Sequence, residues 1–253
     1  MSSKGILYMI PCPISDECEC QDVLPAQNKK VVDELDYFIV ENIRSARRFL
    51  SKYKIAKKID DLEFVELNEH TQAGAAVEAM IKPLLAGRSA GVISEAGVPG
   101  VADPGALVVE ACHRHGIRVV PLVGPSSILL AVMASGLNGQ SFAFNGYLPI
   151  KPQERSKALK IIEKKVKSEG QSQVFIEAPY RNVKLAEQIV QSCAGDLRLV
   201  IACDITSPNE YIAMKPIAEW RREPLPDIAK RPTIFIIGLM ARHTICAIIL
   251  RYK

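Results

Sequence analysis

Residues 94–105 read SEAGVPGVADPG, and this stretch decides the fold class. It follows a short apolar run at 91–94 that is typical of a strand, and it precedes a stretch at 106–115 with apolar side chains at helical spacing. Three glycines and two prolines fix a tightly turned loop that can approach a ligand closely. Loops between a strand and the next helix usually need only about two to six residues, so this longer loop predicts ligand binding.

The same order of strand, loop and helix continues on both sides of this loop. We expect strands at 6–10, 37–40, 63–67, 91–94 and 117–121, the last of them buried, and helices at 43–53, 71–86 and 106–115. Repeated units of this kind with apolar strands indicate a mostly parallel sheet that is covered on both faces.

The pattern changes after residue 136. Strands are expected at 142–147, 173–177, 197–203, 211–214 and 233–238, with a strongly basic helix at 152–167 and another helix at 180–193. More strands with fewer helices between them indicate a mixed sheet. The chain is therefore predicted to be an α/β protein with an N-terminal domain at 1–124 and a C-terminal domain at 125–239; the apolar tail at 240–253 receives no role.

Ligands of open parallel sheets bind beyond the carboxyl ends of the strands. Three loops rich in glycine and proline follow strands here, at 11–16, 95–105 and 123–127. None matches GxGxxG or GxxxxGK[ST], which removes the main support for a dinucleotide site or a phosphate-binding P-loop.

Bulk composition sets further limits. The formal charge of +4 permits a nucleic-acid partner without requiring one. The seven scattered cysteines are typical of reduced thiols, and Cys18 and Cys20 form no CxxC pair, so we expect no metal site. No apolar run approaches the length of a membrane span, and the N-terminus is unlike a secretory signal, which favours a cytoplasmic protein without a membrane partner.

Four segments together resemble the tetrapyrrole methylase superfamily. They are the loop at 94–105, GIRVVPLVGPSSILLAVMASGL at 116–137, FNGYLPIKPQER at 144–155 and FIEAPYR at 175–181. Within this superfamily, the sequence looks most like the branch of bacterial enzymes that methylate the 2′-oxygen of a cytidine in small-subunit ribosomal RNA. The resemblance runs from about residue 6 to residue 238 and is most specific at 94–136.

This resemblance implies two α/β domains with S-adenosylmethionine bound in the cleft between them, S-adenosylhomocysteine as product, and a homodimer. By position, it implies cofactor contacts at Pro13, Gly97, Val98, Pro99, Val101, Ala102, Asp103, Ser126, Ser127, Ala178, Pro179, Cys203, Pro232 and Thr233. Ribosomal RNA or the small ribosomal subunit is the implied partner.

The sequence departs from this branch at two motifs. The usual Thr-Pro-Ile-Gly-Asn strand end is CPISD at 12–16, and the usual Glu-Asp-Thr-Arg is ENIR at 41–44. In the FIEAPYR turn, Tyr180 stands where many relatives have histidine. The cofactor loops are thus better matched than the acceptor side, so methyl transfer is better supported than the identity of the acceptor.

Methyl transfer from a sulfonium needs alignment of the acceptor, exclusion of water and a group that takes a proton from a hydroxyl. Glu41 and Glu95 are the candidates, since each follows a predicted strand. Glu41 is equally consistent with a helix-start carboxylate that satisfies backbone N–H groups. Asp103 is expected to cap the helix that follows Pro104.

RNA binding requires cations near the site. Arg44, Lys151, Arg155 and Arg181 are the candidates, although a solvated helix surface is also rich in lysine. Tyr147 and Tyr180 can stack on an unpaired base, while aromatic residues at strand ends more often serve packing.

Three other functions remain open at the level of sequence. A small-molecule methyltransferase for a tetrapyrrole-like substrate predicts a closed apolar acceptor pocket. A non-catalytic protein that binds S-adenosylmethionine predicts binding without transfer. A nucleotide-dependent oxidoreductase is the weakest alternative, because the dinucleotide fingerprint is absent.

Overall fold

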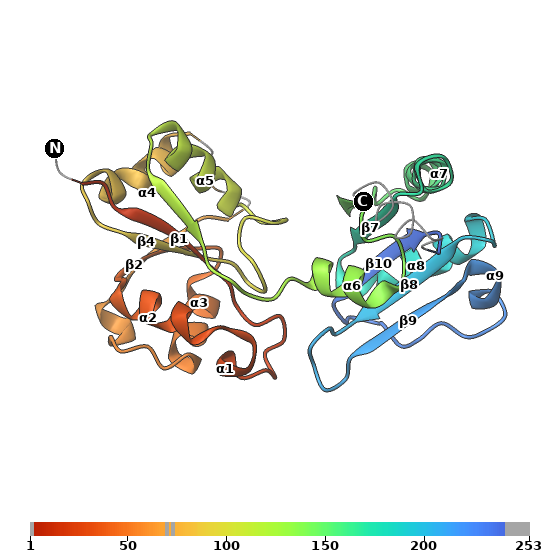
Figure 1. The fold of residues 1–253 in the computed structure, drawn as a ribbon, viewed down its shortest axis with the longest axis horizontal. Helices are drawn as coiled ribbons and strands as arrows, with labels where there is room; N and C mark the ends of the chain where they lie inside the picture. Colours follow the sequence, from red (N-terminus) through yellow and green to blue (C-terminus); the bar gives the residue numbers. More distant parts are fainter. Residues whose placement is uncertain (1–2, 69–70, 72–73, 241–253) are drawn as a thin grey trace, which may run out of the picture. The chain divides into compact units, whose positions relative to one another are not determined.

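The computed structural model describes residues 3–68, 71 and 74–240 (Figure 1). The chain divides into two compact units, unit 1 at Met1–Ser126 and unit 2 at Ser127–Lys253. The division falls close to residue 124, where the sequence places the domain boundary. The apolar tail predicted at 240–253 lies, beyond Met240, outside the described residues.

Unit 1 is built on a five-stranded parallel sheet in the order β3-β2-β4-β1-β5. Its strands are β1 (Ile6–Ile10), β2 (Tyr37–Val40), β3 (Glu63–Glu66), β4 (Ala90–Ile93) and β5 (Arg118–Pro121). Its helices are α1 (Cys20–Val23), α2 (Ala26–Glu34), α3 (Ile43–Lys52), the 3₁₀ helix η1 (Ile59–Asp61), α4 (Ala75–Leu85) and α5 (Gly105–Arg114). The parallel sheet predicted from the alternating units is confirmed.

Helices cover both faces of this sheet, as Figure 1 shows. Side chains alternate along a strand, so Tyr37 and Ile39 pack in the core beneath α4 and α5. Phe38 and Val40 point the other way, into the core formed with α1, α2 and α3. Burial on both faces explains why the central strands are continuous apolar runs.

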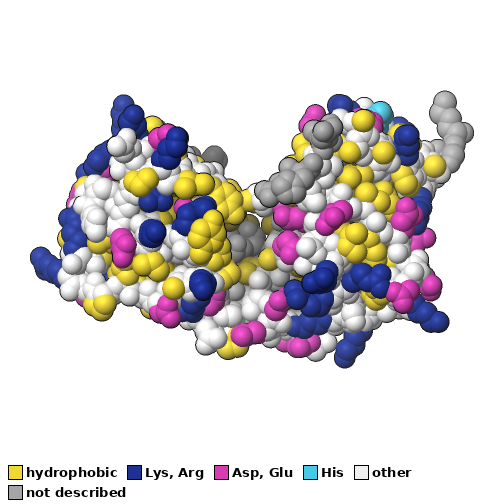
Figure 2. Space-filling model, turned by 180° about the vertical axis from the view of Figure 1, so that it is seen from behind, with side chains coloured by type: hydrophobic (Ala, Val, Ile, Leu, Met, Phe, Trp, Pro, Cys, Tyr) yellow, Lys and Arg dark blue, Asp and Glu magenta, His cyan; other side chains and the backbone are white. Residues whose placement is uncertain are grey.

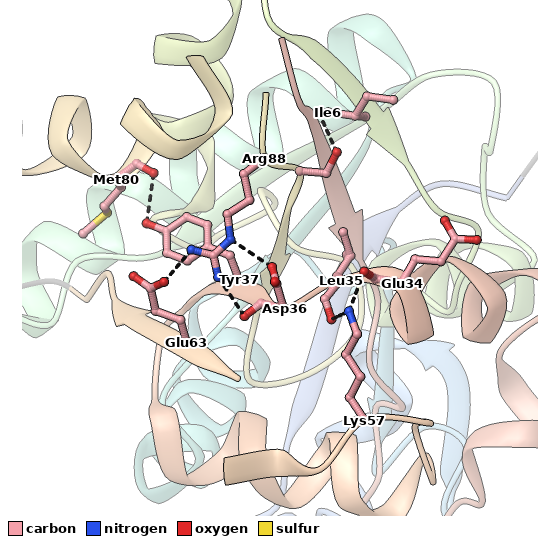
Figure 3. A network of polar contacts seen from close by, with 10 residues as sticks. Ile6, Glu34, Leu35, Asp36, Tyr37, Lys57, Glu63, Met80 and Arg88 are labelled. Carbon is pink, nitrogen blue, oxygen red and sulfur yellow. Dashed lines mark hydrogen bonds and ion pairs between the residues drawn. The ribbon is translucent and has the colours of Figure 1, made fainter. Parts of the chain in front are cut away.

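A polar network lies at the amino ends of the strands of unit 1 (Figure 3). Arg88 donates from Nε to Oδ1 of Asp36 at 2.9 Å and from Nη1 to Oε2 of Glu63 at 2.5 Å, and its guanidinium lies 5.0 Å from the ring centre of Tyr37. The Tyr37 hydroxyl donates to the carbonyl of Met80 at 3.0 Å. Charged groups at this edge therefore join strands β2 and β3 to the turn before β4.

Unit 2 contains a mixed five-stranded sheet in the order β6-β7-β10-β8-β9, in which only β6 and β7 are parallel. Its strands are β6 (Phe142–Tyr147), β7 (Ser172–Ile176), β8 (Arg198–Cys203), β9 (Tyr211–Pro216) and β10 (Thr233–Gly238). Its helices are α6 (Ser127–Ser135), α7 (Pro152–Glu169), the 3₁₀ helix η2 (Pro179–Arg181), α8 (Asn182–Ser192) and α9 (Ile217–Trp220). The predicted mixed C-terminal sheet is confirmed.

Both faces of the second sheet are also covered. Phe175 and Phe235 stack at 5.9 Å on the face that packs against α7, α8 and α9. Val174 and Ile236 lie on the opposite face, in a core completed by α6. Unit 2 therefore has its own hydrophobic core on each side of its sheet.

Some elements differ from those expected. Helix α4 begins at Ala75 and not at Thr71, because Thr71 lies in a turn in which its N–H donates to the carbonyl of Asn68 at 3.0 Å. Strand β5 is an edge strand whose residues are half-buried or exposed, so the expectation of a buried strand there was wrong. Helices α1, α2 and α9 were not expected, since their short or polar sequences show no apolar period.

Candidate functional site

Three loops meet at the carboxyl ends of the strands of unit 1. The N–H of Cys12, after β1, donates to the carbonyl of Gly97, after β4, at 2.8 Å. Gly97 adopts a φ of +67°, and a Cβ at this position would lie 3.2 Å from the carbonyl oxygen of Pro125, after β5. The structure thus joins the loops at 11–16, 95–105 and 123–127 into one site, which we call the carboxyl-edge site.

Asp103 stabilises the long loop from within. Its carboxylate accepts hydrogen bonds from the N–H of Gly100 at 2.8 and 2.9 Å and from the N–H of Gly105 at 2.7 Å. Burial raises the pKa of Asp103, and the bonds from Gly100 and Gly105 counteract part of this rise. The side chain therefore holds the start of α5 and the turn at Gly100 together, which is the capping role expected from the sequence.

The loop at 95–105 offers main-chain N–H donors between Val98 and Ala102. Val101 and Ala102 are exposed, and Ala102 has a left-handed φ of 61°, which costs energy in a residue with a Cβ. Among the hydrogen bonds of the described residues, none uses the N–H groups of Val98, Val101 or Ala102. Main-chain donors without a partner among the described residues, on a loop that holds Ala102 in a left-handed conformation, suit the acceptor atoms of an adenosyl and amino-acid ligand.

A cavity of about 150 Å³ lies beside this loop in unit 1. Glu95 and Ser45 face it, and the Ser45 hydroxyl donates to Oε2 of Glu95 at 3.0 Å. Arg48 pairs with Asp16 at 3.2 Å on the same cavity wall. The remaining lining residues are Cys12, Pro13, Ser15, Cys20, Phe49, Lys52 and Ser94. The cavity therefore combines a carboxylate, hydroxyls and cations, a set that suits a polar acceptor.

Burial disfavours the thiolate form of two cysteines in this cavity. Cys12 and Cys20 are both buried, and burial raises the pKa of each. For Cys12, the neighbouring Cys20, Glu95 and Asp16 raise the pKa further. A thiol with a raised pKa is a poor nucleophile, so we assign neither cysteine a covalent role.

Glu41 lies on the same edge as Glu95. It follows β2, which pairs with β4 so that Val40 lies opposite Ile93. A small cavity is lined by Glu41 together with Asp103 and other residues of both strand ends. The two candidate carboxylates thus come from adjacent strands, but only Glu95 faces the larger cavity.

Asn42 caps helix α3. Its Oδ1 accepts a hydrogen bond from the N–H of Ser45 at 3.1 Å. Asparagine and aspartate cap helices about equally well, so the departure from the family motif at this position preserves the local backbone.

The expected cofactor residues of unit 2 gather at one end of its sheet. Cys203 lies opposite Thr233 in the pairing of β8 with β10, and the N–H of Asp204 donates to the carbonyl of Pro232 at 2.9 Å. The N–H of Lys230 donates to the carbonyl of Pro179 at 3.1 Å. This brings Ala178, Pro179, Cys203, Pro232 and Thr233 together. Ser126 ends unit 1, and Ser127 begins α6 in unit 2.

The four candidate RNA contacts differ in exposure. Arg44 and Lys151 are exposed, and Arg181 keeps 21% of its side chain accessible. The side chain of Arg155 is only 7% exposed, which argues for a structural role and against a direct RNA contact. On the face seen in Figure 2, Lys and Arg side chains are interspersed with acidic ones on each unit.

The sequence of this chain matches the profile of a known protein family over most of its length. The sequence profile of the family described as Tetrapyrrole (Corrin/Porphyrin) Methylases matches residues 22–220. The chain belongs to this family. The resemblance drawn from residues 94–137 is thereby confirmed, and this tetrapyrrole methylase is an enzyme that transfers methyl groups.

Relatives and solved structures agree with this assignment. "Ribosomal RNA small subunit methyltransferase I" of Vibrio cholerae is 31% identical over 85% of this chain and 69% of its own length. The protein of the same name in Haemophilus influenzae is 31% identical over 92% of this chain and 78% of its own length. The crystal structure of the methyltransferase CobJ shares the fold, with a TM-score of 0.63 at 18% identity over 95% of both chains.

Two residues of this tetrapyrrole methylase were missed from the sequence. Ser45 carries no motif that would connect it to Glu95, because the contact depends on how α3 lies beside the end of β4. Glu177 stands within the FIEAPYR segment, directly before the Pro-Tyr-Arg turn, and its position before an arginine was the available signal. Its side chain is fully buried and holds Arg181.

The described residues of the methylase contain neither a cluster of metal-ligating side chains nor a membrane-spanning helix. No three His, Cys, Asp or Glu side chains in this part of the chain lie close enough together to hold a metal ion. Within the described ranges, every helix is too short or too polar to cross a membrane.

Proposed function

We propose that this protein uses S-adenosylmethionine to methylate the 2′-oxygen of a ribose in small-subunit ribosomal RNA. The observation that carries the proposal is the position of the open loop at 95–105 beside a cavity that contains the Glu95 carboxylate. The names of the relatives support ribosomal RNA as the acceptor. The ribose oxygen is supported by the resemblance to the 2′-O-methylating branch.

The loop residues are suited to bind the cofactor. The free N–H groups of Val98, Val101 and Ala102 would donate to its acceptor atoms, while Asp103 keeps the loop in shape. Pro13, Gly97, Pro99, Ser126 and Ser127 complete the proposed contacts of this region. In unit 2, Ala178, Pro179, Cys203, Pro232 and Thr233 remain proposed contacts on the strength of the resemblance.

S-adenosylmethionine supplies an activated sulfonium methyl, so the protein has to orient the acceptor and accept its proton. We propose Glu95 as the group that takes the hydroxyl proton, with Ser45 holding its carboxylate by the 3.0 Å bond. Glu41, at the end of the adjacent strand, is proposed to orient the acceptor or to stabilise the start of α3. Arg44, Lys151 and Arg181 are proposed to bind RNA phosphates.

The decisive experiment uses the full-length protein with labelled cofactor. Small ribosomal subunits from a strain that lacks the corresponding gene are incubated with it, and the labelled nucleotide is mapped. Label on a ribose of small-subunit RNA supports the proposal. Label on a base or no label on RNA overturns it, and label on a tetrapyrrole instead would transfer the assignment to a small-molecule acceptor.

Two finer expectations also belong to this proposal. A homodimer is expected from the family, and light scattering coupled to gel filtration tests it. A cytoplasmic location is expected for an enzyme that acts on ribosomes, and cell fractionation tests it.

A further inference from the structure

A buried carboxylate closes strand β7 in unit 2. Glu177 directly follows Ile176, and its side chain is 0% exposed. Oε1 accepts hydrogen bonds from the N–H of Ala178 at 2.7 Å and from Nε and Nη2 of Arg181 at 2.8 and 2.6 Å. Within the described residues Oε2 has no hydrogen-bond partner, and it lies 3.9 Å from Nη1 of Arg155. Burial of a charge is costly unless the charge is paired, and here Arg181 pairs with Glu177. The pairing fixes the position of the Arg181 side chain.

Arg181 in turn fixes an exposed tyrosine. Its Nη1 donates to the hydroxyl of Tyr180 at 2.6 Å, and its guanidinium carbon lies 4.9 Å from the ring centre. The backbone of this turn is also held, because the N–H of Arg181 donates to the carbonyl of Ala178 at 2.8 Å. Yet Tyr180 remains 69% exposed, so its ring contributes little to the core. An aromatic ring held in one orientation with most of its surface in solvent is prepared for a ligand.

A second exposed ring lies on the neighbouring strand. Tyr147 is 61% exposed and lies opposite Ile176, the residue before Glu177, in the pairing of β6 with β7. The register shifts between Phe144 and Tyr147, and Gly146 has a φ of +62°. Bulges of this kind redirect a side chain at the end of a strand, often next to functional sites.

The local charge favours an anionic ligand. One buried carboxylate faces two guanidinium groups, those of Arg155 and Arg181, which leaves the cluster with an excess positive charge. The hydrogen bonds that Arg181 donates to Glu177 raise the pKa of Arg181, and Tyr180 and Tyr147 add to the rise. Arg181 keeps N–H groups beyond those bonded to Glu177 and Tyr180, and these can reach a phosphate.

We propose that Tyr180, held by Arg181 and Glu177, is a stacking platform for an unpaired nucleobase of the RNA substrate. A flat aromatic face beside an arginine matches the stacking and phosphate contacts by which proteins bind single-stranded RNA. Glu177 acts as a positioning residue and does not touch the RNA. This inference rests on the proposed function, because it requires an RNA acceptor.

The test compares variants in methyl transfer to small ribosomal subunits and in binding of a single-stranded ribo-oligonucleotide. For Tyr180→Ala we expect a KM for RNA and an oligonucleotide Kd raised roughly tenfold to hundredfold, with kcat and the Kd for S-adenosylmethionine within about twofold. Tyr180→Phe keeps the ring and its contact with the Arg181 guanidinium but loses the hydrogen bond to the hydroxyl, so we expect a smaller loss than in Tyr180→Ala, within about threefold of wild type. Glu177→Gln and Arg181→Lys should also weaken RNA binding, to a smaller extent than Tyr180→Ala.

Ile161→Ala is the matched control, since Ile161 is an exposed apolar side chain elsewhere in unit 2. The platform is overturned if the KM for RNA is unchanged in Tyr180→Ala. It is also overturned if Tyr180→Phe or Ile161→Ala weakens RNA binding as much as Tyr180→Ala does. If wild type methylates RNA and Tyr180→Ala does so equally well, the platform fails while the proposed function stands. If wild type binds the cofactor but transfers no methyl to RNA, both fail.

Discussion

The hydroxyl of Ser45, on helix α3, donates a 3.0 Å hydrogen bond to the carboxylate of Glu95, which follows strand β4. The bond joins two segments that are fifty residues apart in sequence. It fixes one oxygen of Glu95 at the wall of the cavity in unit 1 and leaves the other for a further partner. A carboxylate that is oriented but accessible is what a general base for a ribose hydroxyl requires.

Replacement of Glu95 tests this role directly. For Glu95→Gln we expect kcat to fall by roughly 100- to 10,000-fold, because a carboxamide cannot accept the hydroxyl proton. The Kd for S-adenosylmethionine, measured by calorimetry, should remain close to wild type. Glu110→Gln, at an exposed position on α5, is the control and should retain full activity. A Glu95→Gln enzyme with near wild-type kcat would exclude Glu95 as the base.

The conformation of Gly97 gives a prediction on cofactor binding. Gly97→Ala places a methyl group in a left-handed conformation and 3.2 Å from the carbonyl of Pro125. We expect a loss of about 1–2 kcal/mol in unfolding free energy from the backbone conformation, and a Kd for S-adenosylmethionine raised by about tenfold or more.

Gly170→Ala separates these two effects. Gly170 has a similar φ of +65°, with nothing within 4 Å of an added Cβ. This variant should lose similar stability in thermal unfolding but bind the cofactor like wild type. Equal cofactor affinities in the two variants would argue against the loop at 95–105 as the binding site.

The sequence predicted the layers and missed the contacts across them. Apolar runs and helix periods identified the strands of both sheets, because burial of whole strands leaves a pattern in the sequence itself. The turns of the loop at 95–105 were predictable for a similar reason, since its glycines and prolines reflect local backbone geometry. By contrast, the bond from Ser45 to Glu95 and the burial of Arg155 depend on packing between distant segments, which no local pattern records.

Misjudged elements have local causes as well. Helix α2 carries Asn28, Lys29 and Lys30 in its first half, so its apolar side is too weak to stand out. Strand β5 was expected to be buried because its sequence is apolar, but its edge position leaves it partly exposed. Strand order is a tertiary property, and composition alone does not fix it.

Asp103 links stability to pH. Its pKa is raised in the folded protein by burial, so the folded state holds the proton more tightly than the unfolded state, whose reference value is 3.8. The contribution of this group is therefore complete below pH 3.8 and is lost as the pH rises through the folded pKa. Asp103→Asn removes this titration and keeps an oxygen that can accept from Gly100 and Gly105.

We expect the unfolding free energy of Asp103→Asn, relative to wild type, to increase as the pH rises above 3.8 and then to level off. Chemical denaturation at a series of pH values measures this difference. Asp103→Ala loses the hydrogen bonds from Gly100 and Gly105, and its free energy of unfolding should be lower by about 1–2 kcal/mol at neutral pH. A relative stability of the Asn variant that decreases with pH would mean that the pKa is lowered and not raised.

Asn42 tests whether the departure from the family motif matters. Asn42→Ala removes the cap of α3 and should cost about 1 kcal/mol of unfolding free energy. It should also lower methyl transfer, because Ser45 lies in the first turn of that helix. Asn42→Asp restores the family residue. We expect its free energy of unfolding to lie within roughly a few tenths of a kcal/mol of wild type, and its activity to equal that of wild type. Lower activity in Asn42→Asp would show that the amide has a role beyond capping.

Arg44 gives the sharpest test of electrostatic RNA binding. Its side chain is exposed at the start of α3, and within the described residues no hydrogen bond or ion pair engages its guanidinium. Arg44→Ala should weaken binding of small-subunit RNA and reduce the slope of log Kd against log salt by about 1, since one phosphate contact is lost. Cofactor affinity should not change.

Arg118→Ala is the matched control for Arg44→Ala. Arg118 is an exposed arginine of the same unit, but it begins strand β5 and so lies at the amino edge of the sheet, opposite the carboxyl-edge site. Removing it changes the net charge by the same amount, and we expect the salt slope and the RNA Kd to remain those of wild type. If both variants lower the slope equally, RNA responds to the overall charge of unit 1 and does not contact Arg44 in particular.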